Sequence, residues 1–133
     1  MTHIIHLPRP ISTNTLFRNV KGKGRVKTKK YEAWLKEAWA MIAPQKNFKV
    51  IHQPTRLLFA VGEVGVSPRM DGDNCLKGYV DALVENSVIL DDRREILKAI
   101  GMEWVPGKEG ATVYITPFSA TTAVEVPLIG SIR

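Results

Sequence analysis

Two amphipathic helical segments, separated by a β-prone run, constrain the fold of this chain more than any other feature. The first begins after Thr28, a residue type favoured at helix N-caps, and ends before Pro44. The second runs from about Asp73 to Glu85, with Asn86 as its C-terminal cap. In both, apolar residues recur at three- and four-residue spacing, which is typical of helices with one buried face. These residues are Tyr31, Trp34, Leu35, Ala38, Met41 and Ile42 in the first segment and Leu76, Tyr79, Val80, Leu83 and Val84 in the second.

Four β-prone segments accompany these helices, and the last two flank the turn sequence PGKEG, which predicts a hairpin between them. The expected order is therefore β-α-β-α-β-β. Such alternation predicts one α+β (mixed α/β) domain, with a mixed β-sheet and two main helices packed on one face. The predicted strands are residues 3–7, 54–64, 95–105 and 111–117.

The chain has 133 residues, the size of one domain, with 44% hydrophobic and 24% charged residues, as in globular proteins. We expect residues 1–117 to form the domain and residues 118–133 to be a C-terminal extension. No apolar run approaches the roughly 20 residues that a membrane-spanning helix needs, and the first residues lack the long apolar region of a signal peptide. A single cysteine, Cys75, excludes an internal disulfide. We therefore expect a soluble cytoplasmic protein without a membrane partner.

Charge is distributed unevenly along the chain. Residues 1–31 carry eight Lys and Arg and no acidic residue, whereas residues 70–95 carry seven acidic residues and only three basic ones. A basic arm beside an acidic centre suggests that one part holds a polyanion and another processes it. An unevenly charged, solvated surface is the alternative. The basic stretch 18–30 has two glycines and little apolar periodicity, so we expect a flexible loop there.

Four aspartates flank the second helix. Asp71 and Asp73 lie where the helix begins, where its dipole favours ionised carboxylates, and Asp91 and Asp92 follow its end. Carboxylates that come together repel one another unless a cation neutralises them. Oxygen ligands without His or Cys favour Mg²⁺, with Mn²⁺ as a plausible substitute. We therefore expect a metal site, provided that the chain after the helix returns to its start.

Two further polar residues, Asn74 and Lys77, lie in the first turns of the same helix. Lys77 lies one turn beyond Asp73, where its ammonium can stabilise an oxyanion or a leaving group. Each residue also has an ordinary structural interpretation: an aspartate at a helix start is often a cap, an Asp-Asp pair before a strand is often a solvated turn, and a helix lysine is often a surface residue. Asp81 and Glu85 are interpreted as solvated. Only the combination of these acidic residues with Asn74 and Lys77 indicates a catalytic or metal-binding site.

Two motifs together resemble the RusA family of Holliday-junction resolvases. One runs from Asp71-Gly72-Asp73-Asn74 through Lys77 and Asp81-Ala82-Leu83 to Ile89-Leu90-Asp91-Asp92. The other, Leu7-Pro8-Arg9-Pro10-Ile11-Ser12-Thr13-Asn14, is similar to that family's Leu-Pro-x-Pro-x-Ser-x-Asn signature. The order of elements matches through Pro117. The resemblance implies a Mg²⁺-dependent, homodimeric endonuclease, commonly prophage-encoded, which resolves four-way DNA junctions by paired nicks in recombination and repair.

The resemblance also implies roles for individual residues. The chain departs from the family pattern at two places. Arg9 replaces an aromatic residue, and the arginine-rich segment that precedes the acidic motif in the family is reduced here to Arg69. The implied catalytic acids and metal ligands are Asp71, Asp73 and Asp92, with Asp91 as the adjacent acid, Lys77 as the catalytic lysine and Asn74 as a supporting amide.

The symmetry of the implied substrate agrees with a homodimer. A four-way junction has approximate two-fold symmetry, so symmetric cutting requires two sites related by a matching axis. We expect the basic loop to contact DNA phosphates, which makes binding strongly salt-dependent. A non-catalytic nucleic-acid-binding protein and a nuclease that acts on flaps or forks are the alternatives. The expected DNA-contacting residues are Arg18, Lys21, Lys23, Arg25, Lys27 and Arg69.

Overall fold

Strands and helices follow one another in the order β-β-β-α-β-α-β-β, with a short 3-10 turn, η1, after the first strand. The computed structural model describes residues 2–119, so most of the predicted extension 118–133 lies outside the described residues. The single α+β domain is confirmed, with two strands more than expected. The elements are β1 (His3–Leu7), η1 (Thr13–Thr15), β2 (Phe17–Val20), β3 (Gly24–Lys27), α1 (Lys29–Ile42), β4 (Thr55–Gly62), α2 (Asp73–Glu85), β5 (Leu97–Val105) and β6 (Ala111–Pro117).

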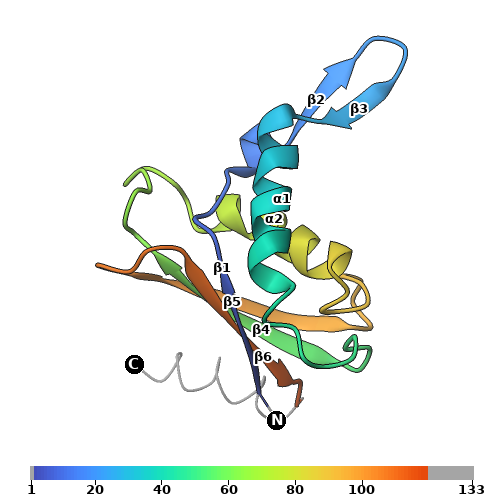
Figure 1. Ribbon diagram of the computed structural model, residues 1–133, viewed down its shortest axis with the longest axis vertical. Helices are drawn as coiled ribbons and strands as arrows, with labels where there is room; N and C mark the ends of the chain where they lie inside the picture. Colours follow the sequence, from blue (N-terminus) through green and yellow to red (C-terminus); the bar gives the residue numbers. More distant parts are fainter. Residues whose placement is uncertain (1, 120–133) are drawn as a thin grey trace, which may run out of the picture.

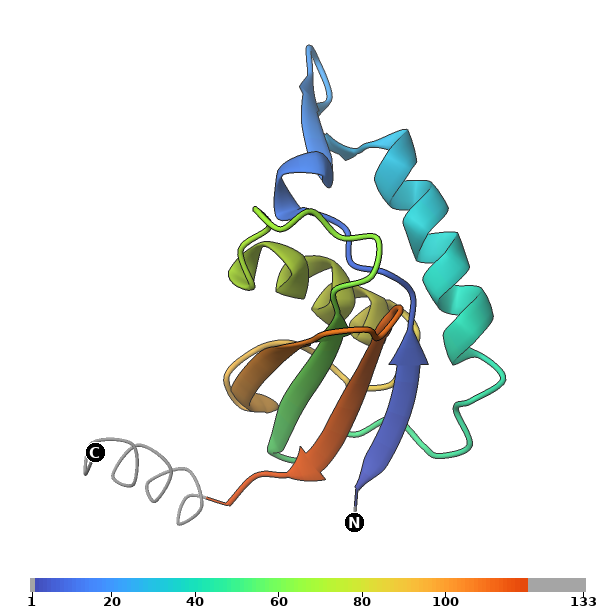
Figure 2. The ribbon, with the colours of Figure 1, turned by 90° about the vertical axis from the view of Figure 1, so that its left-hand side faces the viewer.

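The main sheet has four strands in the order β1-β6-β4-β5 (Figure 1). β6 pairs antiparallel with both β1 and β4, whereas β4 and β5 run parallel. Parallel neighbours need a crossover connection, and α2 provides it. Both helices lie on the same face of this sheet, as predicted (Figure 2).

The predicted hairpin between residues 95–105 and 111–117 is wrong, because β4 lies between β5 and β6. The turn that joins these two strands crosses the end of β4 instead. There the amide of Gly62 donates to the carbonyl oxygen of Gly110 (2.7 Å), and the amide of Val64 donates to that of Lys108 (3.1 Å). A Cβ at Gly62 would lie 2.1 Å from the Lys108 carbonyl oxygen, so this crossing requires glycine.

β2 and β3 form a separate antiparallel pair where the sequence predicted a flexible loop. That prediction was wrong because the two glycines serve a tight turn: Gly22 and Gly24 have φ angles of 83° and 75°, which glycine adopts without strain. Phe17 pairs with Lys27 at the base of the pair. We call residues 17–27 the basic ribbon. It projects away from the sheet, beyond the start of α1 (Figures 1 and 2).

The helices pack on the inner face of the sheet through aromatic side chains. The side chain of Thr28 caps α1 by accepting a hydrogen bond from the amide of Tyr31 (3.1 Å), as predicted. Tyr31 and Tyr79 are completely buried, and Trp34 lies between them. The ring of Phe59, from β4, stacks on Tyr79 with centroids 5.5 Å apart. This cluster fixes α2 on the sheet and thereby places the residues at its start.

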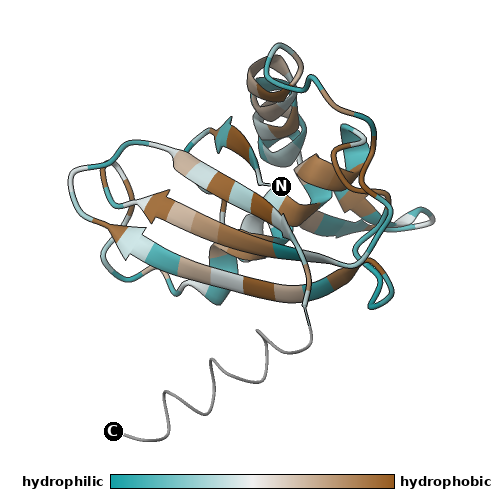
Figure 3. Ribbon diagram, turned by 90° about the horizontal axis from the view of Figure 1, so that it is seen from below, coloured by the Kyte–Doolittle hydropathy of each residue, from teal (hydrophilic) through white to brown (hydrophobic). Residues whose placement is uncertain are grey.

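The opposite face of the sheet is seen in Figure 3, where hydrophobic and hydrophilic residues alternate along the strands. Ile4, Leu58 and Tyr114 lie side by side on three adjacent strands of this face and are 38–49% exposed. Within residues 2–119, no helix is both long enough and apolar enough to cross a membrane.

Candidate functional site

The start of α2 presents two carboxylates to solvent. Asp73 is the first residue of the helix, and Asp71 lies two residues earlier in an exposed position. Gly72 occupies the N-cap position, and no side chain caps the helix. Within residues 2–119, neither carboxylate makes an ion pair or a hydrogen bond. The ordinary interpretation of these aspartates as helix caps therefore does not describe the structure.

Neighbouring residues hold this helix start in place. The hydroxyl of Thr13, in η1, donates to the carbonyl oxygen of Asn74 (2.8 Å). The thiol of Cys75 donates to the carbonyl oxygen of Gly72 (3.0 Å) and contacts the sulfur of Met102 (4.0 Å). Burial raises the pKa of Cys75 to about 11, so the thiol stays protonated near neutral pH and serves packing. These contacts leave the two carboxylates on a fixed backbone.

Lys77 belongs to a three-residue network that links the two helices. Its ammonium lies 3.0 Å from one carboxylate oxygen of Asp81, and the Tyr31 hydroxyl donates to the other (2.7 Å). Burial and the neighbouring Asp81 raise the pKa of Tyr31 above its ordinary value, so this hydroxyl remains a donor. Asp81 is only 19% exposed, and its interpretation as a solvated residue is wrong. The partner that the sequence could not reveal, Tyr31, is 50 residues away.

Asp91 and Asp92 occupy the loop between α2 and β5 and differ in their contacts. Asp91 accepts a hydrogen bond from the amide of Asp92 (2.7 Å) and one from Arg93 (3.2 Å). The Asp92 amide, chiefly, and the Arg93 guanidinium lower the pKa of Asp91. Asp92 is exposed and, within the described part of the chain, forms no ion pair. Asp92 is thus the more available of the two for a ligand.

A single chain keeps the two acidic pairs at opposite ends of α2. Asp73 opens this helix of 13 residues, which is about 20 Å long, and Asp92 follows its other end. The strand pairing agrees: Asp71 follows the end of β4, whereas Asp92 precedes the start of β5, which runs parallel to β4. Residues 2–119 contain no group of three His, Cys, Asp or Glu side chains that could hold a metal ion. The oxygen donors suit a hard cation chemically, but a single chain does not bring Asp92 to Asp71 and Asp73.

The basic ribbon begins beside the start of α2, since it follows η1, which bonds to Asn74. Two of its cations have partners: the Arg25 guanidinium lies 4.0 Å above the Phe17 ring, and the Lys27 ammonium lies 3.4 Å from Glu85. Arg69 is exposed in the loop just before Asp71. The predicted DNA-contacting residues Arg18, Lys21, Lys23, Arg25 and Lys27 are all exposed on the ribbon.

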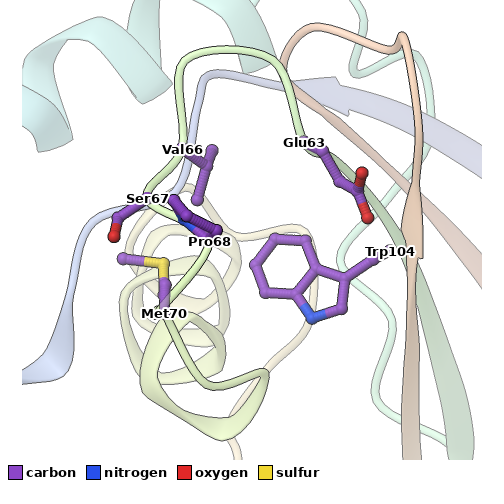
Figure 4. A pocket seen from close by; sticks show the side chains of 6 residues that line it. All are labelled: Glu63, Val66, Ser67, Pro68, Met70 and Trp104. Carbon is purple, nitrogen blue, oxygen red and sulfur yellow. The ribbon is translucent and has the colours of Figure 1, made fainter.

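A pocket of about 290 Å³ is lined by Met70, the residue before Asp71, and was not predicted (Figure 4). It lies between the loop that follows β4 and the indole ring of Trp104 on β5. Sequence reasoning missed it because the loop and Trp104 are separated by more than 30 residues and meet only through the parallel pairing of β4 and β5. Its lining residues are Glu63, Val66, Ser67, Pro68, Met70 and Trp104.

No protein-family model matches the chain, and no curated protein matches it.

Proposed function

We propose that this chain is a Mg²⁺-dependent, structure-selective endodeoxyribonuclease that resolves four-way DNA junctions by paired nicks. The observation that carries the proposal is that one chain combines two exposed carboxylates without partners, at the start of α2, with a projecting ribbon that carries five exposed basic residues and follows η1 directly. Asp71 and Asp73 would hold the ion together with Asp92, and Asp91 would support them. When bound, Mg²⁺ (or Mn²⁺) supplies an activated water and neutralises charge on the phosphate.

The chain's own residues supply binding and electrostatic stabilisation. A two-stranded ribbon is narrow enough to enter the major groove of DNA, and its Lys and Arg side chains neutralise phosphates. Lys77, held by Asp81, offers an ammonium to the oxyanion or the leaving oxygen. Arg69, in the loop before Asp71, adds a cation beside the scissile strand. Acting on DNA in recombination and repair, the protein would work in the cytoplasm of a bacterial host.

The separation of the acidic pairs supports a homodimer. Because Asp92 lies at the far end of α2 from Asp73 in one protomer, a complete ligand set requires Asp92 from a second copy. A two-fold dimer would then carry two such composite sites. Two sites related by an axis match the symmetry of a four-way junction. Dimerisation and metal binding would therefore be linked.

The same separation favours a second candidate, a non-catalytic nucleic-acid-binding protein whose acidic residues are only solvated. A gel assay with synthetic four-way, forked and linear DNA, with and without Mg²⁺ or Mn²⁺, distinguishes the candidates. The proposal predicts metal-dependent, symmetric nicks in four-way DNA. Binding without cleavage in either metal would establish the second candidate, and cleavage confined to forks or flaps would establish a different nuclease.

Asp73→Asn is the matched variant for this assay, because it removes the charge and nearly preserves the shape of the side chain. The proposal predicts that Asp73→Asn binds four-way DNA as the wild type does but does not cut it. Cutting at the wild-type rate would remove Asp73 from the site.

A further inference from the structure

The pocket lined by Met70 and Trp104, called the slot below, offers an aromatic ring and apolar side chains to a ligand. On one side stands the indole of Trp104, and across from it lie Val66, Pro68 and Met70 (Figure 4). Its volume, about 290 Å³, is just below the roughly 300–1,000 Å³ of drug-sized ligand sites, which suits a ligand as small as one ring system. The partly exposed indole, with aliphatic side chains beside it, offers a flat surface on which one planar heterocycle can stack.

Two hydrogen-bonding groups of the lining residues have no partner within residues 2–119. The carboxylate of Glu63 is exposed at the rim and, among residues 2–119, makes no ion pair or hydrogen bond. The indole N–H of Trp104 donates to no group within that range either, whereas the indole of Trp34 donates to the carbonyl oxygen of Arg9 (2.7 Å). A carboxylate accepts hydrogen bonds from amino groups such as N4 of cytosine. A ring with an exocyclic amine would supply the donor that the Glu63 carboxylate lacks.

The position of the slot ties it to the proposed active site. Met70 lines it and is followed directly by Asp71. On β5, Met102 contacts Cys75 in the first turn of α2, and Trp104 lies two residues further along the same face of the strand. A DNA strand held at Asp71 thus passes within reach of the slot. At a branch point, bases have already lost part of their stacking, which lowers the cost of turning one outward.

From these observations we infer that the slot between Glu63 and Trp104 is a nucleobase-binding site. It takes one base, turned out of the stack, and favours bases with an exocyclic amine over thymine. Its placement beside the scissile strand rests on the proposed function, whereas its capacity to bind a base does not. The site gives the protein a way to select where along a branched strand it cuts.

The test measures the binding of fluorescently labelled hexanucleotides, (dA)₆, (dC)₆ and (dT)₆, by anisotropy without divalent cations. Wild-type protein should bind (dA)₆ and (dC)₆ more tightly than (dT)₆. Trp104→Leu should weaken (dA)₆ binding roughly 5- to 150-fold, the usual effect of losing one base–aromatic stack, and Trp104→Phe should restore most of it. Glu63→Gln should narrow the difference in affinity between (dA)₆ or (dC)₆ and (dT)₆, because the glutamine amide can donate a hydrogen bond to a thymine carbonyl oxygen.

Trp39→Leu is the matched control, because Trp39 is 61% exposed on α1, away from the slot, and should leave all three affinities within twofold. Urea unfolding of each variant shows that the fold is kept. Wild-type affinity in Trp104→Leu, or equal loss in Trp104→Phe and Trp104→Leu, overturns the nucleobase site. A protein that cuts four-way DNA but binds hexanucleotides independently of Trp104 refutes only this inference. Binding that depends on Trp104 without any Mg²⁺-dependent cutting refutes only the proposed function.

Discussion

Replacing Tyr31 by Phe removes one hydroxyl from the network that holds Lys77. This hydroxyl donates to the Asp81 carboxylate at 2.7 Å, and the Tyr31 side chain is completely buried. A hydrogen bond to a charged group contributes about 1.5–3 kcal/mol to stability. Asp81 keeps its contact with Lys77 and remains 19% exposed, so water compensates in part. We therefore expect Tyr31→Phe to lower the free energy of unfolding by about 1.5 kcal/mol.

Urea unfolding followed by tryptophan fluorescence measures this loss, and thermal unfolding should show a Tm lower by about 5 °C. The matched control is Tyr114→Phe, because Tyr114 is 38% exposed and its hydroxyl makes no hydrogen bond within residues 2–119. The control should change the free energy of unfolding by less than about 0.5 kcal/mol. Equal losses in the two variants would show that the Tyr31 hydroxyl does not stabilise Asp81.

Four further outcomes are expected. Burial raises the pKa of Cys75 from 9.0 to about 11, so its contribution to stability is complete below pH 9 and is lost as the pH rises through 11. The buried Tyr31 and Tyr79, whose pKa values are also raised, lower the stability of every variant over this range, so the effect of Cys75 is measured as a difference: the free energy of unfolding should fall by about 2 kcal/mol more in the wild type than in Cys75→Ala. Lys77→Met should reduce junction cutting at least ~100-fold but lower the free energy of unfolding by less than about 1 kcal/mol, since the Lys77 side chain is 45% exposed and Asp81 keeps its hydrogen bond from Tyr31. A larger loss of stability would make Lys77 structural. Gly62→Ala should lower the free energy of unfolding, measured with urea, by at least about 2 kcal/mol, because the added Cβ would meet backbone atoms of the turn after β5. An unchanged stability would contradict this close approach. Replacing three ribbon cations by Gln should weaken junction binding and lower the slope of log K against log salt by about 2–3, and an unchanged slope would remove the ribbon from the interface. That triple variant carries Lys23→Gln, Arg25→Gln and Lys27→Gln.

The helices and the carboxylates at the start of α2 were predictable because their signals are local. The Thr28 cap, the apolar periodicity and Asn86 define the helix bounds within a few residues of sequence. The place of β5 in the sheet was not predictable in this way. It depends on the turn 106–110 crossing Gly62, a close approach between segments more than 40 residues apart that no local pattern encodes.

The contacts of the candidate site were less predictable than its location. Asp81 looked solvated because its partner Tyr31 is on another helix. The distance between Asp73 and Asp92 depends on the direction in which the chain returns after α2, and the parallel pairing of β4 with β5 settles that direction. Sequence spacing alone specifies which carboxylates are present, whereas the topology decides which of them meet within one chain.

The most direct test of a composite site is a mixing experiment. Asp73→Asn and Asp92→Asn, each expected to be inactive alone, are mixed and allowed to exchange subunits before the cutting assay. If each site takes Asp73 from one protomer and Asp92 from the other, a mixed dimer holds one intact site and one that lacks both groups. Such a dimer should restore Mg²⁺-dependent cutting of four-way DNA as single nicks, with few paired ones. A mixture as inactive as either variant alone, with mixed dimers demonstrated, would contradict a site shared between two copies.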